Sequence, residues 1–129
     1  MYLVDTSAWI AHFSKKDTFD LRQVCPPEER VMCLPVYQEI LQGIREESQF
    51  RDVRVILDAA VMVGEPLDRS LFLEAVALFR TARRQGLTVR SSIDCQIAAL
   101  AVRHNLVVVH RDRDYPHLAK ISNLHEMTV

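Results

Sequence analysis

The sequence has few cysteines, and their arrangement excludes two classes of protein. Only three occur among 129 residues, at Cys25, Cys33 and Cys95, and no two of them are spaced as a CxxC pair. An odd number of cysteines without such a pair fits neither a disulfide framework nor a zinc site. Single cysteines of this kind are typical of a protein in a reducing compartment, so we expect this one in the cytoplasm.

Long apolar runs and an excess of charge are also missing. No stretch approaches the roughly 20 apolar residues of a transmembrane helix, and we expect no membrane contact. The amino terminus lacks the basic leading segment of a secretory signal, and Asp5 interrupts its first apolar stretch. Sixteen basic and seventeen acidic side chains nearly cancel. Attraction to nucleic acid would have to come from local patches, so composition neither supports nor excludes an RNA partner.

The chain does have an ordinary globular composition, with 49% apolar and 26% charged residues, and its length suits one domain spanning residues 1–129. Short apolar runs predict strands at residues 2–4, 31–34, 61–63 and 106–109, and an edge strand at 124–127. Helices are expected between them, at residues 21–24, 35–44, 50–60 and 70–84, and after residues 5, 91 and 114. Alternating strands and helices predict a three-layer α/β/α sandwich with a mainly parallel central sheet of four to five strands.

Four carboxylates lie where an apolar run ends or a helix should begin: Asp5, Glu39, Asp94 and Asp112. Each has an ordinary structural explanation when taken alone. Asp5 could cap the first helix, and Glu39 could interact with the dipole of its helix. Asp94 lies three residues after Ser91, as in half of a capping box, and Asp112 could begin a turn.

Taken together, the four carboxylates predict a metal site. Asp5 and Asp112 end runs that we expect to be central parallel strands, so both should project from the same edge of the sheet. Glu39 and Asp94 enter from helix starts at that edge. Four converging anions would repel one another unless a cation lay between them. A set of oxygen ligands without paired histidines or thiols suits a hard cation such as Mg²⁺ or Mn²⁺.

Further polar residues are expected at this edge. Asp114 could complete the pocket, coordinate a second ion or cap the last helix. The hydroxyls of Thr6, Ser7 and Ser92 could cap helices or form hydrogen bonds to the metal ligands.

Three other protein classes remain open from the residues alone. A phosphoacceptor signalling domain has a similar length and an acidic Mg²⁺ pocket, but it has paired acids after the first strand, where this chain has Thr6 and Ser7. A haloacid-dehalogenase-like phosphatase would have a second aspartate at position 7. In the third class, a binding or structural protein, the acids would only cap helices.

Four segments resemble, in order, the sequence blocks of PIN-domain ribonucleases: YLVDTSAWI at residues 2–10, PVYQEI at 35–40, SIDCQIAA at 92–99 and HRDRDY at 110–115. Within that family the chain is most similar to VapC toxins of toxin–antitoxin modules, and the resemblance extends from residue 2 to about 118. It implies that Asp5, Glu39, Asp94 and Asp112 are the acidic metal-binding quartet. Asp114 matches an additional acid of many members, whereas His110 stands where members often have Thr or Ser.

The resemblance also implies an activity and partners. We expect an endoribonuclease that hydrolyses RNA with a carboxylate-bound Mg²⁺ or Mn²⁺, forms a homodimer and is inhibited by a cognate antitoxin. Asp5, Asp94 and Asp112 would be metal ligands, and Glu39 would be a ligand or position the attacking water.

The remaining candidates are weaker. RNA phosphates could be bound by basic residues near the acidic edge, although solvated surface charge is the default for each of them: Lys15, Lys16, Arg90, Arg111 and Arg113. His110 could contact phosphate or be a structural histidine at the end of a strand. Trp9 and Phe13, one helical turn apart, would pack in the core or receive an antitoxin helix.

Overall fold

The central sheet has five strands and is parallel throughout in the computed structural model, which describes residues 1–129. Its order is β3-β2-β1-β4-β5. The strands are β1 (Tyr2–Val4), β2 (Arg30–Met32), β3 (Val61–Met62), β4 (Val107–His110) and β5 (His125–Thr128). The predicted α/β class is therefore confirmed, and the last strand pairs in parallel with β4 like the others.

Six helices connect the strands: α1 (Thr6–Phe13), α2 (Leu34–Gln42), α3 (Glu47–Asp58), α4 (Arg69–Arg84), α5 (Ser92–Arg103) and α6 (Asp114–Lys120). Two short 3₁₀ turns, η1 (Leu21–Gln23) and η2 (Pro27–Glu29), lie between α1 and β2. Side chains at the amino ends cap α4 and α5, since Asp68 accepts from the Leu71 amide at 2.8 Å and Ser91 accepts from the Asp94 amide at 3.2 Å. None of the helices combines the length and the apolar character that crossing a membrane requires.

The second predicted strand and the helix after it differ from expectation at their ends. Residues 31–34 were expected to be strand, but β2 ends at Met32 and α2 begins at Leu34. The reason is Pro35, whose fixed φ angle suits the first turn of a helix and draws Leu34 into it. At the other end α2 stops at Gln42 with Gly43 as its cap, so Ile44 lies beyond the helix rather than on its apolar face.

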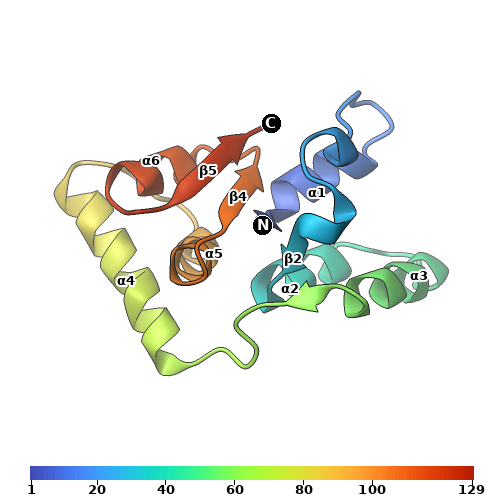
Figure 1. The fold of residues 1–129 in the computed structure, drawn as a ribbon, viewed down its shortest axis with the longest axis horizontal. Coiled ribbons are helices and arrows are strands. Elements are labelled where there is room, and N and C mark those ends of the chain that lie inside the picture. The colour runs from blue at the N-terminus through green and yellow to red at the C-terminus, as the bar shows by residue number, and fades with distance from the viewer.

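The two faces of the sheet pack against different clusters, because neighbouring residues of a strand point to opposite faces. Leu3 and Val108 belong to a cluster of 22 buried residues that includes most of the inner side of α5. Val4 and Val109 belong to a cluster of five that includes residues of α1 and η1. Helices α1 and α5 both contact β4 (Figure 1). Helix α5 contributes to the larger cluster and α1 to the smaller one. The buried cluster on the side of α1 and η1 is thus the smaller of the two.

The strand order creates a switch point between β1 and β4. From β1 the chain passes to β2 on one side, whereas from β4 it passes to β5 on the other. Connections that leave neighbouring parallel strands in opposite directions open a crevice at their carboxyl ends, which is where ligands bind in open α/β sheets.

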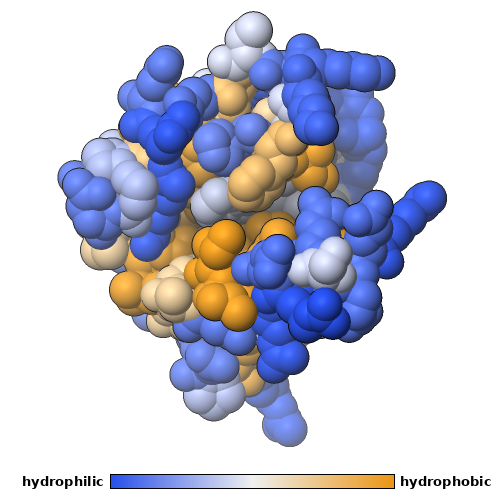
Figure 2. All heavy atoms as spheres, turned by 90° about the vertical axis from the view of Figure 1, so that its right-hand side faces the viewer, coloured by the Kyte–Doolittle hydropathy of each residue, from blue (hydrophilic) through white to orange (hydrophobic).

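One face of the molecule also carries a hydrophobic groove. Figure 2, which looks at the side where α1 and α3 lie, shows a hydrophobic area bordered by hydrophilic side chains. A groove with a volume of about 460 Å³ runs here from Thr6 and Glu39 to apolar residues of α1, α2, α3 and the α2–α3 loop: Trp9, Ile10, Phe13, Ile40, Ile44 and Val53. Ile10 and Phe13 are 65% and 62% exposed, so this groove is open to a partner.

Candidate metal centre

Two acids reach the crevice directly from the strands that flank the switch point. Asp5 follows β1, and its amide donates to the Val109 carbonyl at 2.9 Å, so the ladder between β1 and β4 continues to the site. Asp112 comes two residues after β4. The inference that both acids project from one edge of a parallel sheet therefore agrees with the observed register of these strands, Leu3 with Val108 and Val4 with Val109.

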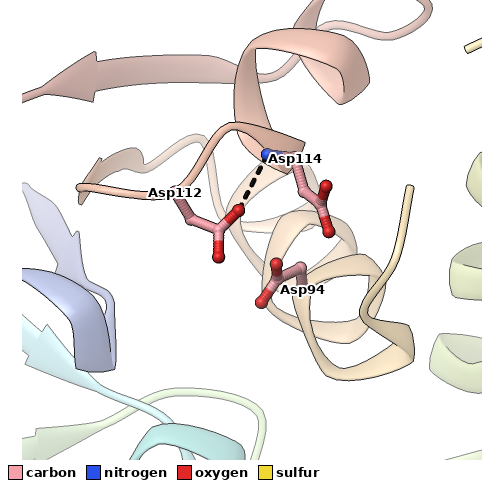
Figure 3. A group of neighbouring side chains, drawn as sticks. All are labelled: Asp94, Asp112 and Asp114. Atoms are coloured by element: carbon pink, nitrogen blue, oxygen red, sulfur yellow. Dashed lines mark hydrogen bonds between the residues drawn. The ribbon is translucent and has the colours of Figure 1, made fainter. Parts of the chain in front are cut away.

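Three carboxylates converge tightly at this edge. One oxygen from each of Asp94, Asp112 and Asp114 lies within 4.8 Å of the others (Figure 3). Asp94 comes from the first turn of α5 and Asp114 from the start of α6. Asp112 Oδ1 accepts from the Asp114 amide at 2.9 Å, which places these two side chains next to each other. Asp114 thus belongs to the tightest group, and it does not serve as the cap of α6, whose capping residue is Arg113.

Two oxygens in this group are buried without any hydrogen-bond partner: Oδ2 of Asp94 and Oδ1 of Asp114. The other oxygen of Asp114 accepts from the Arg90 and Ser91 amides at 2.9 and 3.1 Å, which fixes the side chain beside Asp94 and Asp112 (Figure 3). Buried carboxylate oxygens without partners are costly, and a cation would remove that cost. The donor set, all oxygen and at least doubly negative, fits a hard divalent cation.

Asp5 lies beside this group and is joined to it through a tyrosine. The buried hydroxyl of Tyr115 donates to Asp5 Oδ1 at 2.7 Å and lies 3.5 Å from Asp94 Oδ1. The second oxygen of Asp5 accepts from the Ser7 amide at 2.9 Å and from the Ser7 hydroxyl. Glu39 is reached through Thr6, whose hydroxyl donates to Glu39 Oε1 at 3.2 Å.

The pKa values in the site reflect its burial and its accumulated negative charge. Burial, followed by the charges of the neighbouring acids, raises the pKa of Asp94 to about 8, and the acids that contribute are Asp5, Asp112, Asp114 and Glu39. The pKa of Glu39 is also raised, first by burial and to a lesser extent by the charge of Asp5. The hydrogen bond from the Thr6 hydroxyl opposes this shift. The four acids named from the sequence, together with Asp114, therefore share one electrostatic environment.

His110 is part of the protein interior and does not face a phosphate. It is fully buried, its Nδ1 accepts from the Asp112 amide at 3.0 Å, and its Nε2 lies 2.7 Å from Glu126 Oε2. Since Nδ1 accepts, the ring proton must lie on Nε2 and be donated to Glu126. His110 is therefore not a substrate contact. It has a structural role, because it fixes the backbone at Asp112.

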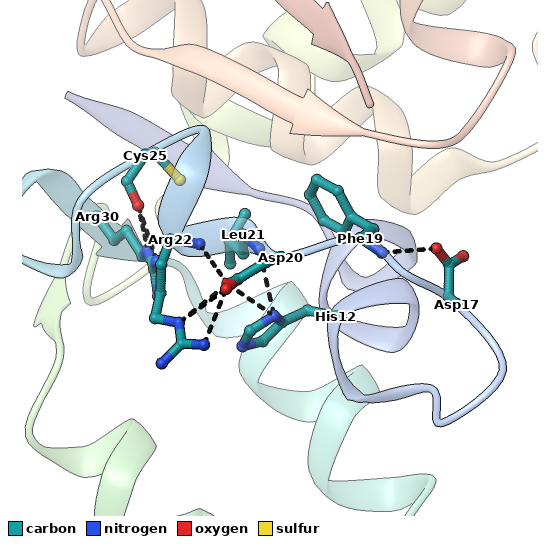
Figure 4. Close-up of polar contacts among 8 residues, drawn as sticks. All are labelled: His12, Asp17, Phe19, Asp20, Leu21, Arg22, Cys25 and Arg30. Atoms are coloured by element: carbon teal, nitrogen blue, oxygen red, sulfur yellow. Dashed lines mark hydrogen bonds and ion pairs between the residues drawn. The ribbon is translucent and has the colours of Figure 1, made fainter.

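Among the basic residues expected to bind RNA phosphates, Arg90 contacts the acids and Arg111 does not. Arg90 is half exposed, and its Nε lies 3.8 Å from Asp114 Oδ1. Arg111 is occupied: its guanidinium binds Asp17, donates to the Val129 carbonyl at 2.9 Å and lies over the Phe19 ring. It thus ties the carboxyl-terminal strand to the segment between α1 and β2, where further polar contacts, such as that of the Phe19 amide with Asp17, order the chain (Figure 4).

The remaining candidates make no direct contact with the acids. Arg113, Lys15 and Lys16 are exposed and make no ion pair. Ser92 is exposed, and its side chain forms no hydrogen bond to any of the acids, whereas Thr6 and Ser7 do.

Sequence reasoning missed two residues of the site, Tyr115 and Glu126. Tyr115 directly follows Asp114 at the start of α6, so its position in the chain placed it at the correct edge. Nothing in the sequence indicated that its hydroxyl would point at Asp5. Glu126 lies in β5, and its contact with His110 depends on the pairing of β5 with β4, which puts it opposite Val108.

Comparison with known proteins shows the family and the fold of the chain. The sequence model of the family described as PIN domain matches residues 2–121. The chain is 37% identical over 131 aligned positions to the VapC ribonuclease Mb1587 of Mycobacterium bovis and to ribonuclease VapC11 of Mycobacterium tuberculosis, with 96% of this chain and 96% of each relative covered. The solved structure of VapBC2 from Rickettsia felis bound to a DNA fragment from their promoter is similar in fold, with a TM-score of 0.73 and 14% identity over 99% of this chain and 98% of that one.

Proposed function

The chain belongs to the PIN-domain family, and from that premise we propose that it is a metal-dependent endoribonuclease and the toxin of a toxin–antitoxin pair. The 37% identity to VapC ribonucleases across 96% of the chain supports this activity. We place the protein in the cytoplasm, because all three cysteines are buried and unpaired, as is usual in a reducing compartment.

The observation that carries the proposal is the group formed by Asp94, Asp112 and Asp114, with two buried oxygens that lack partners. These three side chains would hold the cation, Mg²⁺ or Mn²⁺, with Asp5 beside them. When bound, such a cation lowers the pKa of a water molecule and offsets negative charge on the phosphate under attack. A neighbouring positive charge would also keep Asp94 ionised, although its pKa without a cation is about 8.

The residues of the chain supply orientation and proton handling. Glu39 lines the groove and accepts from the Thr6 hydroxyl, and its raised pKa makes it a suitable acceptor for a proton of the attacking water. In the hydrolysis the oxygen of this water forms a bond to phosphorus. The P–O bond to one of the two RNA fragments breaks, and that fragment leaves as an alcohol after taking up a proton. Arg90 is the cation best placed to hold a flanking phosphate, because its guanidinium lies at the acids and remains half exposed.

The activity is tested by expressing the chain and mapping new RNA ends in the presence of Mg²⁺ or Mn²⁺. Cleavage should disappear with a chelator and return with either cation. Asp94→Asn and Asp112→Asn should each lower cleavage by at least about 100-fold, whereas Asp52→Asn, an exposed aspartate of α3, should leave cleavage unchanged. Equal cleavage by the parent and both site variants would reject the assigned centre.

An antitoxin would bind in the hydrophobic groove between α1, α2 and α3. The groove is lined mostly by apolar side chains, which suits the apolar face of a helix, and it includes Glu39, so that a bound helix would cover this acid. Phe13→Gln should weaken antitoxin binding strongly in a pull-down or by calorimetry. Val55→Gln removes an equally exposed apolar side chain of α3 outside the groove, and it should not.

A homodimer would form through the outer face of α4. That helix exposes four large apolar side chains, Phe72, Leu73, Val76 and Phe79, beside an apolar pocket that reaches Cys95 of α5. Contiguous exposed apolar side chains of this extent usually mark an interface. Leu73→Lys should shift the sedimentation coefficient from dimer to monomer.

A further inference from the structure

Tyr115 occupies a position in the acidic centre that the proposed chemistry does not use. Its side chain is fully buried, and its hydroxyl lies between two acids that come from opposite parts of the chain. It donates to Asp5 Oδ1 at 2.7 Å and lies 3.5 Å from Asp94 Oδ1. A hydroxyl has one proton, so the shorter contact is the hydrogen bond and the longer one a second acceptor within reach.

The ring that carries this hydroxyl is held from several sides. Tyr115 lies in the large hydrophobic cluster, and the centroid of its ring is 4.6 Å from that of His110. The His110 ring is in turn fixed by Glu126 and by the Asp112 amide. Packing around the ring therefore fixes the position of the hydroxyl, which donates to Asp5.

Asp5 is accordingly bound on both of its oxygens. Ser7 donates to Oδ2 from its amide and its hydroxyl, and Tyr115 donates to Oδ1. Carboxylates that ligate metals are commonly oriented by such outer hydrogen bonds, which hold the ligand in place before the metal arrives. Asp94 differs, because its Oδ2 has no donor at all.

We propose that Tyr115 is a positioning residue of the metal centre, whose hydroxyl holds Asp5 beside Asp94 so that Asp5 can contribute to binding a divalent cation. This inference rests on the proposed function, since it assumes that the acids bind a cation. The hydroxyl donates because a tyrosine ordinarily keeps its proton at physiological pH.

A purely structural role predicts the opposite effect on cation binding. If the hydroxyl only stabilises the charge of Asp5 through its hydrogen bond, its removal leaves that charge for a cation to stabilise instead, and affinity stays the same or rises. If it positions Asp5, its removal lets the two carboxylates move apart, and affinity falls. The sign of the change in cation affinity therefore separates the two roles.

The experiment compares Tyr115→Phe with Tyr37→Phe. Both substitutions remove one hydroxyl that donates to an aspartate, because Tyr37 donates to Asp58 Oδ1 at 2.8 Å on the exposed surface. Binding of Mn²⁺ alone is measured by calorimetry at constant pH. Tyr115→Phe should weaken it by about 10- to 100-fold, the usual effect of losing a partner of a metal ligand, and Tyr37→Phe should leave it unchanged. RNA cleavage should lose kcat with little change in KM.

Unchanged or tighter Mn²⁺ binding by Tyr115→Phe would overturn the inference while leaving the proposed function intact. If the parent protein itself binds no Mn²⁺, the proposed function fails first. A second measurement needs no variant and so does not depend on whether Tyr115→Phe folds. The buried hydroxyl proton of Tyr115 should give a slowly exchanging NMR resonance that shifts as Mg²⁺ is added to the parent, and a resonance that stays still at saturation would also overturn the inference.

Discussion

Replacing Asp94 with asparagine should stabilise the protein in the absence of a cation, even though it destroys the centre. In the folded protein the pKa of this carboxyl is raised to about 8, mainly by burial. In an unfolded chain an aspartate has a pKa of about 3.9. Between these two values the folded protein keeps a proton that the unfolded chain has released, so the free energy of unfolding of the parent falls as pH rises.

The size of the effect follows from that interval. At pH 7 the pH exceeds the pKa of an unfolded aspartate by about 3 units. At roughly 1.36 kcal/mol per unit, the loss in the free energy of unfolding of the parent is at most about 4 kcal/mol. Asparagine has no proton to retain and avoids this cost. For a domain of this size the melting temperature of Asp94→Asn should exceed that of the parent by on the order of 10 °C at pH 7, with almost no difference near pH 4.

Differential scanning calorimetry in the presence of a chelator, from pH 4 to pH 8, measures this directly. Asp52→Asn is the matched control, because that aspartate of α3 is exposed and should give no gain that grows with pH. Added Mg²⁺ should then raise the melting temperature of the parent and not that of Asp94→Asn. A gain that is absent, or that does not grow with pH, would refute the reasoning that Asp94 is a buried acid crowded by other acids.

Three further substitutions test the roles assigned to Arg90, Arg111 and His110. Arg90→Ala should raise KM for RNA several-fold and weaken its dependence on salt, with kcat nearly unchanged, because its guanidinium is at the acids and half exposed; unaltered KM across salt concentrations would contradict this. Arg111→Ala should instead lower the urea concentration at which the protein unfolds, since it loses its contacts with Asp17 and the Val129 carbonyl, and RNA affinity should change little. His110→Phe should lower the free energy of unfolding by about 1–3 kcal/mol, because Glu126 and a backbone amide lose their partner; a variant as stable as the parent in urea denaturation would be evidence against that role.

The fold was predictable because its signals are local. Short β-branched runs and capping residues indicated the strands and the helix starts, and the parallel α/β class followed from their alternation. Ser91 caps α5, and positive φ angles after the ends of α4 and α5 occur at Gly86 and Asn105, two residue types that tolerate them. The error at residues 31–34 had a local cause as well, since the effect of Pro35 reaches back to Leu34.

Within the site, the sequence predicted which acids would meet but not how they are arranged. Strand ends placed Asp5 and Asp112 at one edge, because all parallel strands end there. That β1 lies directly beside β4, although most of the chain separates them, follows from the way the sheet is assembled. The same assembly brings Asp114, rather than Asp5, into the tightest group with Asp94 and Asp112.

The sequence by itself determined the kind of chemistry, because the types of side chain and their places at the ends of strands and helices are local properties. Only the tertiary structure decided which oxygens lack partners, that Tyr115 bridges Asp5 and Asp94, and that His110 is an internal support. Hydrogen-bond partners and burial depend on distances between segments far apart in the chain, and those distances exist only once the sheet and its helices have packed.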